Sequence, residues 1–253
     1  MKKISKFIYL AVVLAIWWVG SIVVNKSLFV PSPVETFGMI ANLFEDGIIF
    51  KHLGASFLRI TAGVLIAAAI SIPLGMGIAW YKPVNRIFKP IVDSFQYIPV
   101  TCFQAILFLL LGIDEEMKIT FITIAVLFSF LPTVIQTCKE DFTEITETAY
   151  TMGFSYTRTL IHCVIPYVAP SILKSLITVY GVGWTYVILA EINNTPFGLG
   201  HLMHISQARG QSAMVWGAIL IIAVVSFIFN KVANFIIKKC FKWRYLDEQS
   251  VKN

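Results

Sequence analysis

Residues that could carry chemistry are few and scattered in this sequence. His201 and His204 stand three apart in Gly-Leu-Gly-His-Leu-Met-His, so both could lie on one face of a helix and bind a metal ion. Two ligands without a neighbouring cysteine or a clear carboxylate partner are a weak signal, so we expect ordinary histidines in a loop and no metal. No nucleophile is grouped with a base, and no catalytic residue is predicted.

A nucleotide-binding loop is missing as well. The pattern Gly-x-x-x-x-Gly-Lys-Ser/Thr does not occur, and the chain contains no Gly-Lys pair. Any ATP hydrolysis linked to this protein must therefore take place in a separate chain.

The composition is that of a membrane protein. Of the 253 residues, 57% are hydrophobic and only 13% are charged, with a mean hydropathy of +0.78. Soluble domains carry about 25% charged residues, so this chain has too little polar surface to coat a globule in water. We predict an all-α membrane protein with six spans and one membrane domain over 1–253. The spans are 7–25, 60–80, 94–113, 119–138, 174–190 and 210–230.

Orientation follows from the distribution of Lys and Arg. Six spans put both termini on one side, and that side holds 15 of the 20 Lys and Arg residues. Cytoplasmic loops carry the positive excess, so we predict that both termini and the segment 139–174 are cytoplasmic. The net charge of +6 is therefore explained by the excess of Lys and Arg on the cytoplasmic side and gives no support for nucleic-acid binding.

The segment between spans four and five predicts a helical hairpin. Over 140–152, Glu140, Glu144 and Glu147 form one acidic stripe at helical spacing. Gly153 can take the left-handed conformation that ends a helix, and we expect a second helix to stop at Pro166.

Three interpretations of this hairpin remain open on physical grounds. It could be a connector resting on lipid headgroups, although an acidic stripe is unfavourable at an anionic leaflet. It could be a DNA-binding helix-turn-helix, although its basic charge is sparse. It could also present its exposed face to a soluble partner protein.

Polar and aromatic residues on spans three and five could line a pathway through the membrane. The candidates are Gln96, Tyr97, Gln104, Thr185 and Tyr186. Each could equally hold helices together, because polar groups in a bilayer are satisfied best between helices. Apart from Lys174 at the start of the fifth, the six predicted spans contain no Asp, Glu, Lys, Arg or His, which disfavours a proton- or sodium-coupled carrier.

The hairpin resembles the cytoplasmic Glu-Ala-Ala loop of ABC-importer permease subunits. Glu147, Ala149, Gly153 and Pro166 match that pattern, whereas Thr148 replaces the middle alanine. The segments 52–80, 93–113 and 189–203 are also similar to the family. With Val-Pro-Ser-Pro-Val-Glu-Thr-Phe over 30–37, they resemble the branch that handles nitrate, taurine, alkanesulfonates and pyrimidine or vitamin precursors.

This resemblance implies a type I importer permease fold in a bacterial inner membrane, with the hairpin 139–166 as the coupling element. Its implied partners are two ATPase subunits, which hold ATP and Mg, a substrate-binding protein and a second permease copy. Glu191 matches an acidic position of the family and could buttress an outer gate, or simply hydrogen-bond nearby backbone. The alternative function is a carrier or channel that needs no ATPase. The solute, and the choice between homodimer and heterodimer, stay open.

Overall fold

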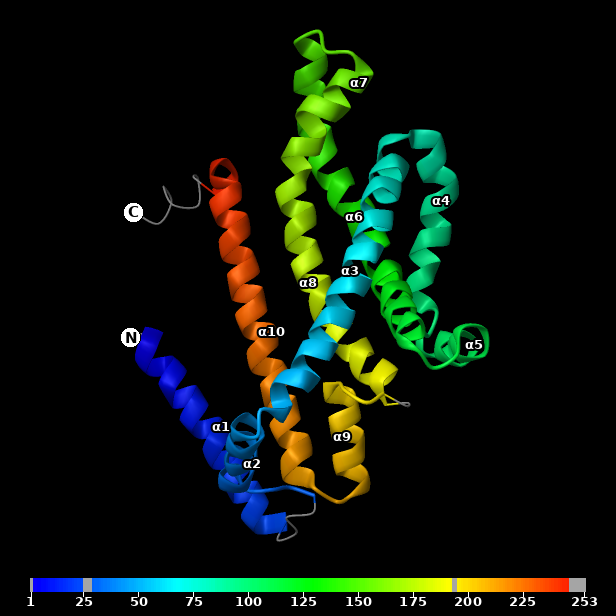
Figure 1. Cartoon of the computed structure of the whole chain (residues 1–253). Helices are drawn as coiled ribbons and strands as arrows, with labels where there is room; N and C mark the ends of the chain where they lie inside the picture. The colour runs from blue at the N-terminus through cyan, green and yellow to red at the C-terminus, as the bar shows by residue number, and fades with distance from the viewer. Residues whose placement is uncertain (1, 25–28, 193–194, 246–253) are drawn as a thin grey trace. The chain divides into compact units, whose positions relative to one another are not determined.

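The computed structural model of this chain describes residues 2–24, 29–192 and 195–245, and every regular element in these ranges is helical. Figure 1 labels the helices along the chain. They are α1 Lys2–Val24, α2 Pro33–Glu45, α3 Ile48–Trp80, α4 Lys82–Ser94, α5 Thr101–Leu111, α6 Glu115–Thr151, α7 Tyr156–Arg158, α8 Ile165–Glu191, α9 Leu199–Ala208 and α10 Ser212–Cys240. Short 3₁₀ turns occupy Phe95–Tyr97 and Lys242–Tyr245, and Thr159–Val164 forms a π-helical segment.

Four helical segments of the described chain are long and apolar enough to cross a bilayer, which makes the protein an all-helical membrane protein. They are Ile48–Trp80, Glu115–Lys139, Tyr156–Glu191 and Ser212–Cys240, and a bent helix pair makes up to five. The described apolar part of α1, Ala11–Val24, is shorter. The total of six spans therefore stays a prediction.

The third predicted span, 94–113, is not a straight helix. The segments Lys82–Tyr97 and Thr101–Leu111 meet at 94°. Pro99 lacks an N–H and disfavours helical backbone at the residue before it, and Ile98 is indeed extended, with φ −87° and ψ 121°. The uncharged window that suggested one span contains this break.

The chain divides into two compact units. Unit 1 combines Met1–Leu58 with Glu191–Val225, and unit 2 combines Arg59–Ala190 with Ser226–Asn253. In unit 1, Trp17 stacks on Trp216 with ring centroids 5.4 Å apart, and its indole N–H donates to the Pro31 carbonyl. Ser32 begins α2 through a capping box with Glu35, so local sequence fixes this helix start.

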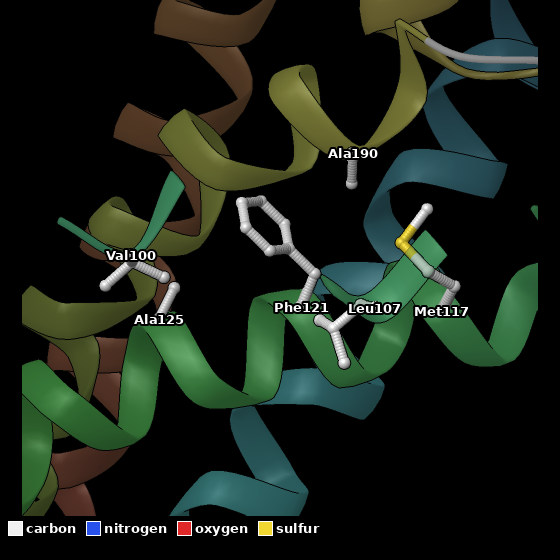
Figure 2. Close-up of a cluster of buried hydrophobic side chains, with 6 residues drawn as sticks. All are labelled: Val100, Leu107, Met117, Phe121, Ala125 and Ala190. Atoms are coloured by element: carbon white, nitrogen blue, oxygen red, sulfur yellow. The ribbon is translucent and has the colours of Figure 1, made fainter. Parts of the chain in front are cut away.

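The core of unit 2 is built where α5, α6 and the end of α8 meet. Figure 2 shows Phe121 and Met117 of α6 directed toward Ala190 of α8, with Leu107 of α5 beside them. Glycines let neighbouring helices approach closely here. A Cβ on Gly63 would lie 2.7 Å from Ile122, so α3 and α6 could not pack this way with a larger residue.

Candidate functional site

The helical hairpin is formed by the joined tips of α6 and α8, with α7 at the turn (Figure 1). α6 runs without a break from the predicted fourth span to Thr151, so the first hairpin helix is a continuation of that span. Gly153 has φ +81°, the left-handed conformation that the sequence predicted. The N–H of Phe154 donates to the Ala149 carbonyl and that of Gly153 to the Tyr150 carbonyl, which is a Schellman ending.

The second arm differs from the prediction, because Pro166 does not end a helix. Thr159–Val164 forms a π-helical segment, in which the N–H of Ile165 donates to the Leu160 carbonyl five residues earlier. Pro166 then lies in the first turn of α8, where a backbone N–H has no partner within the helix, so the missing N–H of proline costs no intrahelical hydrogen bond. A continuous helical path from Tyr156 to Glu191 results, so both arms connect the hairpin directly to membrane-length helices.

The surface of the hairpin is partly apolar. Met152 is 72% exposed, and Phe154 and Ile161 are exposed as well. Glu147 also faces solvent, whereas Ala149 on the first arm and Thr159 on the second are buried. The side chains of Glu140 and Glu144 lie outside the described residues, so the acidic stripe is described only at Glu147. An exposed apolar tip on a rigid polar hairpin is typical of a protein-docking surface.

Glu191 is fully buried at the end of α8 and organises the loop that follows. The Ser56 hydroxyl lies 2.8 and 2.9 Å from its two carboxylate oxygens and donates to them. The Gly200 N–H donates to the same carboxylate at 2.9 Å, and the Leu199 N–H donates to the Ser56 oxygen at 2.9 Å. Leu199 and Gly200 are the first residues of α9, so Glu191 and Ser56 supply the cap that Gly198 cannot provide.

His52 holds the same loop from the other side of Gly198. Its Nδ1 lies 2.8 Å from the Gly198 carbonyl oxygen and 3.1 Å from the Gly198 nitrogen, so it donates or accepts according to its tautomer. Its ring stacks on that of His201 at 6.3 Å. Burial, followed by the neighbouring His52 and His204, lowers the pKa of His201 below its ordinary value of 6.5. The described residues contain no group of three potential metal ligands.

A second ionic cluster lies in unit 2, where α3 meets the start of α6. The guanidinium of Arg59 donates to both oxygens of Glu115, at 2.6 and 2.7 Å, and Lys118 reaches the same carboxylate at 3.2 Å. Arg59 and Lys118 are buried, whereas the Glu115 side chain is half exposed. The predicted spans begin at residues 60 and 119, so both cations were left just outside them and the cluster was not predicted. The signal available was that each stands at the edge of an uncharged window.

The five pathway candidates fall into different surroundings. The Gln104 side chain donates to the Leu189 carbonyl, and Tyr186 packs edge-on against Phe121, so these two belong to the α5–α6–α8 core. Tyr97 is 86% exposed. Thr185 is exposed on α8.

Gln96 contributes to a polar cavity that the sequence did not indicate. It lines a cavity of about 360 Å³ together with Thr133, Gln136 and Thr137 of α6. These three α6 residues recur at helical spacing, so the pattern was present in the sequence. The contact of the turn Phe95–Tyr97 with α6 brings Gln96 to them, and no local pattern encodes that contact.

Comparison with known proteins identifies one family. Residues 69–241 match the family described as "Binding-protein-dependent transport system inner membrane component".

Relatives match over most of their length. A putative ABC transporter permease of Methanocaldococcus jannaschii is 27% identical, covering 92% of this chain and 90% of the relative. The taurine transport system permease TauC of Escherichia coli is 26% identical, covering 87% and 82%. A putative aliphatic sulfonates transport permease, SsuC of Bacillus subtilis, is 24% identical, covering 92% and 85%.

A solved structure shows the same fold. A structure of the MetNI methionine ABC transporter in an inward-facing conformation superposes with a TM-score of 0.67 at 13% identity, covering 77% of this chain and 97% of that one.

Proposed function

This chain belongs to the family of binding-protein-dependent transport system inner membrane components, and on that premise we propose that its hairpin over 139–166 couples ATP hydrolysis in a partner chain to import. The chain is the permease subunit of an ABC importer and is not itself an enzyme. A carrier or channel without an ATPase, the alternative from sequence, is not supported by this membership.

The observation that carries the proposal is the exposed apolar tip of the hairpin at the end of two membrane-length helices. Met152, Phe154 and Ile161 offer a surface that a cleft in an ATPase subunit would cover. The Schellman ending at Gly153 and the unbroken α6 make the tip rigid, so a push on it moves α6 and α8 together. Glu147 borders this surface, while Ala149 allows the close packing of the arms and Pro166 lies where the second arm enters α8.

The membrane topology and the subunit composition of the importer are proposed on the same premise. We place both termini and the hairpin in the cytoplasm of a bacterial inner membrane, with α1 and the bent α4–α5 pair completing six spans of one membrane domain. Two copies of the permease would assemble with two ATPases, which bind ATP and Mg, and with a substrate-binding protein. The family implies ATPase and binding-protein partners, and the copy numbers are our proposal.

Glu191 would then buttress the outer gate. It lies at the opposite end of α8 from the hairpin and fixes the loop that leads into α9. A carboxylate with this many fixed partners holds one loop geometry, so movement of α8 carries that loop with it. The pathway would run past the polar cavity at Gln96 and past Tyr97, Gln104, Thr185 and Tyr186.

The solute is proposed to be a small sulfonate such as taurine. Two of the relatives above carry taurine or aliphatic sulfonates in their names, and a formylaminopyrimidine permease is 22% identical over 90% of this chain. A pyrimidine precursor is therefore the second candidate. Uptake of labelled taurine and of labelled formylaminopyrimidine by cells carrying the complete importer separates these two.

The coupling role is tested with Met152→Asp in the reconstituted importer. Burying a methionine stabilises an interface by about 1.5–3 kcal/mol, so its loss should weaken ATPase binding by about 10- to 150-fold. Met152→Leu is the matched control, because it keeps the apolar area. Full ATP-driven uptake and undiminished ATPase binding by Met152→Asp would refute the docking surface.

A further inference from the structure

A cavity of about 1100 Å³ lies in unit 2, where α3 turns into α4 beside the last turns of α6. Its lining includes the aromatic Trp80 at the end of α3, the start of α4 and the α6 face that carries Lys139 and Glu147. The pathway candidates and the docking residues Met152, Phe154 and Ile161 do not line this space, whereas Glu147, which borders the docking surface, does. All of its walls come from one compact unit, so its geometry is defined within that unit.

Two buried hydrogen-bond donors in this lining have no acceptor among the described residues. They are the indole Nε1 of Trp80 and the amide Nδ2 of Asn85. Trp80 is only 7% exposed, and its ring is fixed between Phe142 and Tyr156. A buried donor without a partner costs about 1–3 kcal/mol, so an acceptor that enters from the cavity and reaches these shielded atoms would stabilise the site.

Positive charge gathers at the same cavity. Lys82, Arg86 and Lys139 line it against one described carboxylate, Glu147, and the structure gives none of the three cations an ion pair within the described ranges. Lys89, one turn further along α4 and outside the cavity, does pair with Asp93. Among the described residues, Lys89 of α4 is thus neutralised by a carboxylate, whereas Lys82 and Arg86 of the same helix are not.

The start of α4 adds partial positive charge beside the three cations of the cavity. The helix begins at Lys82, and Tyr81 at the preceding position makes no side-chain cap. Pro83 has no N–H and the Asn85 N–H donates to the Tyr81 carbonyl, so the N–H groups of Lys82 and Val84 are the ones open to an acceptor. The helix dipole places partial positive charge at this end. Cations, neutral N–H donors and an uncapped helix start thus converge on one cavity.

We propose that this cavity binds a phosphate group, either the headgroup of an anionic phospholipid or a soluble phosphate ester. A phosphate offers several acceptor oxygens, which matches guanidinium, ammonium, indole and amide donors better than a planar carboxylate does. The lipid is the favoured source, because α4 also exposes Ile87, Phe88 and Ile91, an apolar strip on which acyl chains can pack.

The site has a consequence for transport. Glu147 and Tyr156 of the hairpin line the same cavity, so an occupant bridges α4 to the hairpin. Binding itself stands on the cavity alone; only this consequence rests on the proposed coupling role. Phosphate or lipid bound there would stiffen the base of the hairpin.

The test uses the purified permease–ATPase complex in neutral detergent, titrated separately with phosphatidylglycerol, phosphatidylcholine and inorganic phosphate and followed by native mass spectrometry. We expect one tight phosphatidylglycerol per permease chain. A basic residue at an anionic headgroup contributes about fivefold in affinity, so Arg86→Gln should weaken binding about fivefold and Lys82→Gln with Arg86→Gln about 25-fold. Lys89→Gln is the matched control on the same helix and should leave binding unchanged.

Trp80→Phe keeps the ring and removes the N–H, and should weaken binding about tenfold through the lost charge-assisted hydrogen bond. The Arg86→Gln comparison keeps the proposal testable if that variant does not fold. Saturation by inorganic phosphate with no preference for phosphatidylglycerol would support the phosphate site with a soluble ligand. Equal losses in Arg86→Gln and Lys89→Gln, or no binding of any probe, would overturn it. Absent binding with full ATP-driven uptake would overturn the site alone and leave the coupling function standing.

Discussion

Substituting Gly198 by alanine tests whether the buried carboxylate of Glu191 organises the loop before α9. Gly198 has φ +153°, and a Cβ built on it would lie 2.4 Å from both Cδ and one oxygen of Glu191. No real Cβ tolerates such a contact, so the carboxylate must move. Moving it breaks the bonds from the Ser56 hydroxyl and the Gly200 N–H.

The expected cost follows from those two bonds. Each hydrogen bond to a charged group contributes about 1.5–3 kcal/mol, and the strained backbone adds about 1 kcal/mol, so Gly198→Ala should lower the free energy of unfolding by about 4–7 kcal/mol. In a Glu191→Ala background the obstacle is gone, and the same substitution should cost only about 1 kcal/mol. The two positions should therefore show a coupling energy of about 3 kcal/mol or more in a double-mutant cycle.

Equilibrium unfolding in mixed detergent micelles measures all four corners of this cycle. Gly54→Ala serves as the control, because Gly54 lies in α3 of the same unit with no atom within 4 Å of its added Cβ. Alanine there should stabilise by about 0.5–1 kcal/mol. An additive cycle, with Gly198→Ala equally costly whether or not Glu191 is present, would refute the steric and electrostatic reasoning.

Three further perturbations test other parts of the molecule. Gly153→Val should abolish ATP-driven uptake with normal membrane insertion, while Gly153→Asn, which tolerates φ +81°, should retain uptake; wild-type uptake by the valine variant would contradict the coupling role. Glu115→Gln leaves Arg59 and Lys118 as buried like charges and should lower the free energy of unfolding by about 2–3 kcal/mol. Arg59→Met leaves Glu115 paired with Lys118 and should cost less. Equal losses in the two variants would argue against the cluster. The pKa of His201 is lowered in the folded state, so the stability that depends on its neutral form is present above pH 6.5 and is lost as the pH falls below 6.5. His201→Gln should therefore flatten the decline in unfolding free energy on acidification. An unchanged slope would show that other groups cause the decline.

Local signals in the sequence predicted the parts of the hairpin that depend on neighbouring residues. The turn at Gly153 is confirmed, since only the local backbone conformation decides it. The end of the second arm at Pro166 was predicted wrongly, because a proline in the first turn of a helix loses no essential bond and a π-helical segment precedes it. The third span stays a prediction: apolar composition was counted across Pro99, where the helix pair bends by 94°.

Composition and local pattern were enough to identify a helical membrane protein without a nucleotide-binding loop, whose spans are interrupted by a glycine-ended hairpin. Composition, helical periodicity and single-residue backbone preferences are properties of short segments, so they can be read without a fold. Only the tertiary structure decided which charges are buried. Ser56 meets Glu191 across 135 positions of sequence, and Arg59 meets Glu115 across 56. No local pattern encodes such pairings, because a charge is buried only where the packing of distant helices supplies its partner and excludes water.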